Sequence, residues 1–131
     1  MQRGEEPDDA VDALARRVIG AAIEVHKEIG PGFLESVYEN AMSVELVLRG
    51  IPFVQQHPIS LTYKGRDVGL SKLDFLVANT LVLELKAVNM LNNLHSAQVI
   101  SHLRATHLKL GLLINFNVPL LKNGLKRIIL S

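Results

Sequence analysis

The segment Leu83-Glu84-Leu85-Lys86 places a carboxylate and an ammonium group in an otherwise apolar stretch of the chain. Side chains alternate between the two faces of a β-strand, so Glu84 and Lys86 are expected to point the same way, about 6.6 Å apart along the strand. A buried charge is costly unless it is paired or bound to a metal ion. Taken alone, this pair fits a structural ion pair as well as it fits a catalytic one.

A second apolar strand is expected around Asp74, and its register against the first strand depends on the turn between them. A two-residue loop, 79–80, would place Asp74 opposite Leu85. A three-residue loop, 78–80, places it opposite Glu84, and a bulge would also let the two carboxylates converge. Two such carboxylates repel unless a cation joins them, and carboxylate oxygens suit Mg²⁺ or Mn²⁺. The sequence therefore predicts a Mg²⁺ or Mn²⁺ site of Asp74 and Glu84, with the backbone carbonyl of Leu85 as a further ligand.

Helical segments supply the other polar side chains that could take part. Glu35 and Tyr38 share one helix face, although the helix dipole alone would explain a glutamate in a first turn. Gln98 shares a face with His95 and His102, and it could hold a phosphate or a metal-bound water, or be an ordinary, partly exposed helix residue. The absence of cysteine and of a His-Glu-x-x-His pattern argues against zinc.

Three helices are expected to position these residues. Apolar residues recur at helical spacing over about 9–29, after Asp8 or Asp9 as the capping residue, and Gly30-Pro31-Gly32 ends that helix. A second helix is expected over 33–49. Asn93 is expected to cap a third helix, 94–107.

The remaining elements are strands separated by turns. Strands are expected over 51–54, 59–63, 73–77, 81–88 and 110–115, with a tight turn at 64–67 and a terminal strand or helix at 125–130. The order ααββββαβ plus a terminal element predicts an α/β fold, a mixed β-sheet flanked by α-helices. Residues 1–8 are expected to form a flexible N-terminal tail and residues 9–131 a single domain, because 131 residues suit one domain.

Composition narrows the class of protein. The chain has no cysteine, so it has neither a disulfide framework nor a thiolate site. No apolar leader and no apolar run of membrane-spanning length is present, so we expect no membrane partner and a cytoplasmic location. The net charge is only +1, so a nucleic-acid partner would have to be held by a local patch.

Lysine and arginine side chains are the candidates for phosphate binding. Lys72 and Arg104 are the principal candidates, although an isolated surface cation is more often simply solvated. The wider set also includes Lys64, Arg66, Lys109, Lys122, Lys126 and Arg127.

Gly32-x-x-Glu35-x-x-Tyr38 resembles the signature of the GxxExxY protein family. The other similar segments are 19–32, 73–77, 84–87, 95–98 and 112–117, so the resemblance covers roughly residues 18–129. That family is similar to a branch of the PD-(D/E)xK nuclease superfamily, which has a restriction-endonuclease-like core. The resemblance therefore implies that fold and a metal-dependent nuclease that acts on nucleic acid, DNA rather than RNA.

The resemblance also implies roles for individual residues. Asp74 and Glu84 would bind Mg²⁺ or Mn²⁺, and Lys86 would assist the attacking water. Glu35 would correspond to the helical acid of exonuclease-like branches. Gln98 would correspond to the glutamine of their Gln-x-x-x-Tyr motif.

The last position of that motif departs from the pattern, because His102 stands where the tyrosine is expected. The alternative to a nuclease is a non-catalytic nucleic-acid-binding or assembly module with the same fold. The retained Asp74, Glu84 and Lys86 argue against it, since a retired site would lose charges that are costly to bury. A zinc-dependent small-molecule hydrolase is a third and weaker hypothesis. For the oligomeric state, a homodimer is an open alternative.

Overall fold

The computed structural model describes residues 8–130, and the expected tail lies outside the described residues except for Asp8. Asp8 is the N-cap of helix α1 (Asp9–Ile29), where its Oδ1 accepts a hydrogen bond from the backbone N–H of Val11 at 2.9 Å. The helix ends at Gly30, whose positive φ of 75° suits glycine. The expected first helix is therefore confirmed, with Asp8 rather than Asp9 as its cap.

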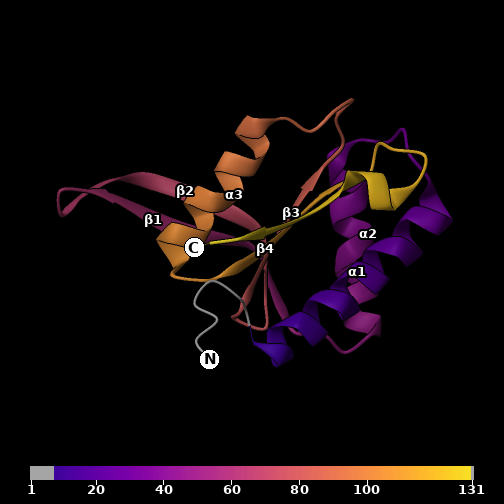
Figure 1. The fold of residues 1–131 in the computed structure, drawn as a ribbon, viewed down its shortest axis with the longest axis horizontal. Helices are drawn as coiled ribbons and strands as arrows, with labels where there is room; N and C mark the ends of the chain where they lie inside the picture. The colour runs from indigo at the N-terminus through magenta and orange to yellow at the C-terminus, as the bar shows by residue number, and fades with distance from the viewer. Residues whose placement is uncertain (1–7, 131) are drawn as a thin grey trace.

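A five-stranded sheet in the order β1-β2-β3-β4-β5 forms the centre of the molecule (Figure 1). Its strands are β1 (Phe53–Tyr63), β2 (Arg66–Val77), β3 (Leu81–Lys86), β4 (Leu110–Asn115) and β5 (Leu125–Ile129). Strands β3 and β4 are parallel and the other pairs are antiparallel, so the sheet is mixed. Helix α3 (Asn93–Thr106) makes the crossover between the parallel strands, and a 3₁₀ turn (Leu121–Gly124) leads into β5.

The helices cover both faces of this sheet. Helix α1 and helix α2 (Glu35–Leu48) pack on one face, where their apolar residues join Phe75, Leu83 and Leu112 in the larger core. Helix α3 packs on the other face, where Val99 and Leu103 join a smaller core. Strand β4 is buried along its whole length, because it lies between both helical layers. Glu84 of the neighbouring strand β3 is likewise buried, although its side chain is ionisable.

The expected strand order is wrong in one respect. The two short strands expected over 51–54 and 59–63 are one continuous strand, β1, so three strands rather than four precede α3. Lys64 and Gly65 have positive φ values of 52° and 78° and form a two-residue hairpin turn that allows pairing to continue into β2. Pro58 is accommodated because β1 is the edge strand of the sheet.

Several expected boundaries also shift. Helix α2 starts at Glu35 rather than at residue 33, and β3 ends at Lys86 rather than at residue 88. Asn92, not Asn93, caps α3, because its side chain accepts from the N–H groups of Leu94 and His95. Glu35 is consequently the first residue of its helix.

About halfway along the β1–β2 hairpin, the regular alternation of side chains between the two faces of the sheet is interrupted. The ladder leaves Gln56 opposite Asp74, and Gln56 has a φ of 52°, a left-handed conformation that strands rarely contain. Residues two apart in a regular strand share a face, yet Phe75 packs in the α1–α2 core and Leu73 in the α3 core. Asp74 therefore lies at a kink, where its side chain is freed from the regular alternation.

Candidate active site

Asp74 is held beside β3 by the backbone of that strand. Val77 of β2 pairs with Leu81 of β3, so three residues, 78–80, connect the two strands. The pairing between β2 and β3 ends at Phe75, which lies opposite Leu83. Asp74 comes directly before Phe75 in β2, and its Oδ2 accepts a hydrogen bond from the backbone N–H of Leu85 at 2.8 Å. The carboxylate thus replaces a strand partner, and this fixes its position at the point where β2 and β3 separate.

The backbone of Leu85 faces the same edge of β3. The N–H of Phe116 donates to the carbonyl oxygen of Lys86 at 2.9 Å, so the backbone of Lys86 faces β4. Successive strand residues present their backbone groups to opposite edges, and the N–H and C=O of one residue share an edge. The carbonyl of Leu85 is therefore directed to the side on which Asp74 lies.

Glu84 is buried and bonded to His102 of α3. Its Oε2 lies 2.7 Å from Nδ1 of His102, and each side chain is only 6% exposed. Nε2 of the same imidazole lies 2.9 Å from Oγ of Ser71 on β2. With Nδ1 donating to the carboxylate, Nε2 of a neutral ring accepts the proton of the serine hydroxyl. The residue that departs from the Gln-x-x-x-Tyr pattern thus holds Glu84 in place.

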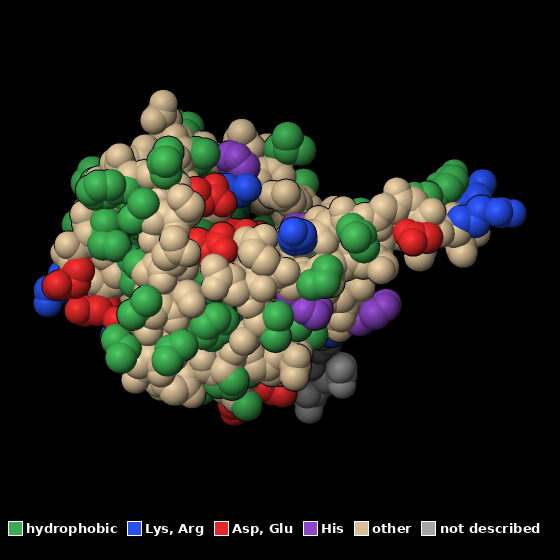
Figure 2. Space-filling view, turned by 180° about the vertical axis from the view of Figure 1, so that it is seen from behind, with side chains coloured by type: hydrophobic (Ala, Val, Ile, Leu, Met, Phe, Trp, Pro, Cys, Tyr) green, Lys and Arg blue, Asp and Glu red, His purple; other side chains and the backbone are tan. Residues whose placement is uncertain are grey.

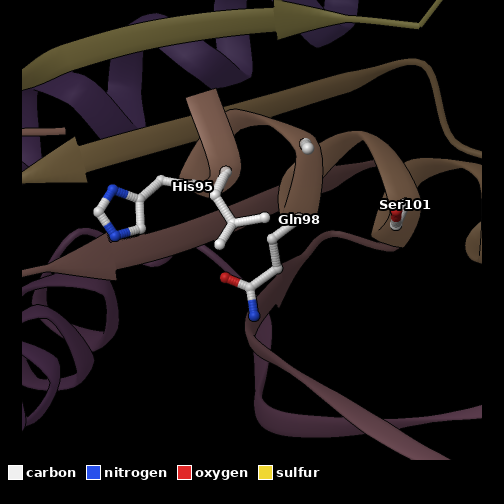
Figure 3. Close-up of a pocket in the computed structure, with 5 residues that line it drawn as sticks. His95, Gln98 and Ser101 are labelled. Atoms are coloured by element: carbon white, nitrogen blue, oxygen red, sulfur yellow. The ribbon is translucent and has the colours of Figure 1, made fainter. Parts of the chain in front are cut away.

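Lys86 follows Glu84 on the same face of β3 and meets the first half of α3. Its Nζ donates to Oε1 of Gln98 at 3.3 Å. Gln98 and His95 line a shallow cavity of about 350 Å³ on α3, and Figure 3 shows them with Ser101 on successive turns of this helix. Gln98 therefore links α3 to the end of β3, where the charged side chains lie.

Helix α2 contributes carboxylates from the other side. Glu39 lies one turn after Glu35, and its carboxylate accepts from Nε2 of Gln55 at 2.5 Å and from Nε2 of Gln56 at 2.9 Å. The same Nε2 of Gln56 lies 3.4 Å from Oδ1 of Asp74. Gln56, the kinked residue of β1, thus joins the Glu39 carboxylate of α2 to Asp74.

The sequence reasoning missed Glu39 and Gln56. The spacing of Glu39 from Glu35 is a helical i, i+4 repeat, which could have identified it as a residue on the same helix face. The left-handed conformation of Gln56 has no signal in the sequence, because glutamine has no preference for it.

These side chains form one electrostatic group. Burial raises the pKa of Asp74 to about 7; the hydrogen bond from Leu85 opposes this rise, and the charges of Glu84, Glu35 and Glu39 add to it. Burial also raises the pKa of Glu35, against the lowering effect of the Lys86 ammonium. Figure 2 shows acidic side chains gathered near the middle of one face, with a basic side chain and a histidine beside them. Carboxylates outnumber cations here, an arrangement that favours cation binding.

Tyr38 has a clear structural task. It is fully buried, its hydroxyl donates to the carbonyl of Gly30 at 2.7 Å, and it accepts from the N–H of Phe33 at 3.2 Å. Its ring stacks on Phe116 with the centroids 4.7 Å apart. These contacts fix the turn between α1 and α2, and so they fix the place where Glu35 starts its helix.

Of the remaining candidates, His95 and Lys72 lie close to residues of the site and Arg104 lies apart from it. Nδ1 of His95 accepts from the N–H of Asn92 at 3.1 Å as part of the helix cap. Lys72 is exposed on β2, two residues before Asp74. Arg104 lines a separate cavity of about 390 Å³ between α3 and β1.

The donor atoms near Asp74 and Glu84 limit which metal ion this site could bind. Among residues 8–130, no group of three or more Asp, Glu, His or Cys side chains could hold a metal ion. The smaller set of Asp74, Glu84 and the Leu85 carbonyl offers oxygen atoms alone. Such a set fits Mg²⁺ or Mn²⁺, which bind through one or two carboxylates and complete their shells with water and substrate phosphate.

Comparison with known proteins identifies the family. Residues 12–128 match the family described as the PD-(D/E)XK nuclease superfamily, and this range includes every candidate residue of the site. No curated protein matches the chain. Helices in the described part of the chain are too short or too polar to cross a bilayer. The mixed five-stranded sheet with three helices agrees with the restriction-endonuclease-like fold of that superfamily, and the chain belongs to the PD-(D/E)XK nuclease superfamily.

Proposed function

We propose that this protein is a Mg²⁺- or Mn²⁺-dependent nuclease of the GxxExxY branch, which hydrolyses phosphodiester bonds of DNA. The observation that carries the proposal is the position of Asp74, which is bonded to the Leu85 N–H and adjoins Glu84 at the point where β2 and β3 separate. Membership of a nuclease superfamily gives this arrangement of acids and Lys86 its chemical interpretation.

Asp74, Glu84 and the carbonyl of Leu85 would hold the metal ion. A bound divalent ion polarises a phosphate oxygen and lowers the pKa of a coordinated water. The raised pKa of Asp74, about 7, supports a cation at this place, because a carboxylate that resists ionisation among other acids is stabilised by a positive charge.

The other side chains of the site orient reactants and hold charges in place. Lys86 presents its ammonium on the same face as Glu84, where it can orient the attacking water and offset charge that develops on the phosphate. Gln98 accepts a hydrogen bond from that ammonium and restricts its position. His102 fixes the carboxylate of Glu84, and Glu35 adds a further acid from α2.

The bond between Glu84 and His102 also favours a second candidate. A glutamate satisfied by a buried histidine could be purely structural, as in a non-catalytic nucleic-acid-binding module of the same fold. His102 occupies one carboxylate oxygen, however, and the other remains available to a cation. The two candidates differ in one measurable respect, which is metal-dependent cleavage.

Cleavage assays on labelled single-stranded, duplex and branched DNA, with RNA for comparison, distinguish these candidates. We expect cleavage of DNA with Mg²⁺ or Mn²⁺ and none with EDTA. The variant Lys86→Gln should bind metal but cleave slowly. Glu28→Gln, which changes an exposed glutamate of α1, is the matched control and should cleave normally. Binding of nucleic acid without metal-dependent cleavage of any substrate would favour the non-catalytic module.

A further inference from the structure

The outer part of the β1–β2 hairpin takes no part in the proposed chemistry at Asp74 and Glu84. Residues 57–73, here called the β-arm, lie beyond the kink and extend away from the rest of the molecule (Figures 1 and 2). Helix α3 packs on Ile59 and Leu73 at the base of the arm, but every residue from Thr62 to Leu70 is exposed. A two-stranded ribbon is marginally stable alone, so an exposed one of this length suggests a surface for a partner.

The charge of the β-arm differs in sign from that of the rest of the chain. The arm contains three of the 14 Lys and Arg residues and one of the 13 Asp and Glu residues, so its net charge is +2 while that of the other residues is −1. Lys64 and Arg66 flank Gly65 at the tip, and Lys72 lies near the base. The single acid, Asp67, is engaged within the arm, where it accepts from the N–H of Gly69 at 3.1 Å. The net positive charge and the cations at the tip of the β-arm are suited to binding a polyanion.

The dimensions of the β-arm match those of a DNA groove. From Leu73 to Arg66 the strand rises about 24 Å at roughly 3.4 Å per residue, which equals the length of about seven base pairs. The major groove of B-DNA is about 12 Å wide and admits a two-stranded ribbon, whereas that of A-form RNA is too narrow.

The position of the arm relative to the acids adds a functional reason. Asp74 directly follows Leu73, so the base of the arm adjoins the proposed metal site. A site rich in carboxylates repels a phosphate backbone, and cations on the approach offset this repulsion. We propose that the β-arm lies in the major groove of duplex DNA and directs one strand to the Asp74–Glu84 site; this last step rests on the proposed nuclease function.

Single-stranded DNA fits the arm less well. Binding of single strands depends on stacking of bases on aromatic rings. Tyr63 is the one Phe, Tyr or Trp residue of the arm, and Nζ of Lys64 lies 5.4 Å from the centre of its ring. Exposed Val68 and Leu70 instead offer apolar contact of the kind that thymine methyl groups accept in the major groove.

Fluorescence anisotropy with EDTA present tests the proposal without any catalysis. The probes are a labelled 20-base-pair duplex and one of its strands. The test variant is Lys64→Gln with Arg66→Gln, and the matched control is Lys27→Gln with Lys122→Gln, which removes two exposed charges from α1 and the 3₁₀ turn.

We expect the wild type to bind the duplex about tenfold or more tightly than the single strand. The arm variant should weaken duplex binding about tenfold, and the slope of log K against log salt should fall by about 1.8, or roughly 0.9 for each lost phosphate contact. The control should bind as the wild type does. Unchanged melting temperatures establish that both variants fold, since all four positions are exposed.

Three results would overturn the proposal. The first is duplex binding by the arm variant that equals that of the wild type, and the second is equal affinity of the wild type for both probes. The third is sedimentation of the wild type as a dimer that Leu70→Asp converts to a monomer, which would identify the arm as an interface between two copies. Duplex binding through the β-arm without cleavage would instead contradict the proposed nuclease function and support the binding of DNA by the β-arm.

Discussion

Replacement of Asp74 by asparagine is expected to stabilise the metal-free protein at high pH. The pKa of Asp74 is raised from an ordinary 3.8 to about 7, so the folded protein holds this proton up to near neutral pH while the unfolded chain releases it near pH 4. The folded state therefore binds more protons in this window, and stability falls as pH rises from about 4 to about 7. Asparagine, which is neutral and of equal size, removes this loss and can still accept from Leu85.

The magnitude follows from the pKa values. Between pH 5 and pH 8 the wild type should lose about 1.4 kcal/mol per pH unit until Asp74 ionises near pH 7, which is at most about 3 kcal/mol. Solvent reaches part of this carboxyl group, and screening reduces the figure by roughly half. The free energy of unfolding of Asp74→Asn, relative to the wild type, should thus rise by about 1.5 kcal/mol from pH 5 to pH 8.

Urea unfolding followed by circular dichroism, in EDTA at pH 5 and pH 8, measures this difference. Glu28→Gln is the control, because Glu28 is exposed on α1 and should show no comparable dependence. A difference between Asp74→Asn and the wild type that is the same at both pH values, or larger at pH 5, would refute the reasoning.

Three further predictions concern metal binding and packing. Mn²⁺ at a hundredfold excess over its Kd should add about 2.7 kcal/mol to the wild type, measured as a rise in Tm by calorimetry, and Asp74→Asn should lose most of that gain. His102→Ala leaves buried Glu84 without its partner, so the free energy of unfolding should fall by about 1–3 kcal/mol. Titration calorimetry should show that the Mn²⁺ affinity falls by about tenfold or more, and His102→Gln should restore part of this affinity. Unchanged Mn²⁺ affinity in His102→Ala would contradict the positioning role of His102. In Gly111→Ala the new Cβ would lie 2.6 Å from Cγ1 of Val99, so chemical denaturation should show a loss of about 1–3 kcal/mol, and wild-type stability would contradict this packing.

Local patterns were sufficient to predict most of the fold. The helical spacing of apolar residues located α1 and α2, and uninterrupted apolar runs located β3 and β4 between two helical layers. The register of Asp74 could be narrowed to two alternatives, because a connection of two or three residues decides which face it takes. The family match to residues 12–128 confirms the expected PD-(D/E)xK nuclease superfamily, and the GxxExxY branch stays a proposal.

Features that depend on tertiary contacts were not predictable. Two short strands were expected over 51–54 and 59–63, yet β1 is continuous through Pro58 because it pairs with β2 and lies at the sheet edge. The kink at Gln56 requires a left-handed residue that the sequence does not mark. His102 could be placed on the face of Gln98, but its bonds to Glu84 and Ser71 depend on how α3 packs across β2 and β3.

The central claim is that Asp74 and Glu84 hold a divalent ion for phosphodiester cleavage. The most direct test compares Mn²⁺-dependent cleavage of a labelled DNA duplex by the wild type, by Asp74→Asn and by the control Glu28→Gln, each shown to be folded. We predict cleavage by the wild type and the control, abolished by EDTA, and none by Asp74→Asn. Cleavage by Asp74→Asn at the wild-type rate, or no cleavage by the wild type with Mn²⁺ or Mg²⁺, would contradict the claim.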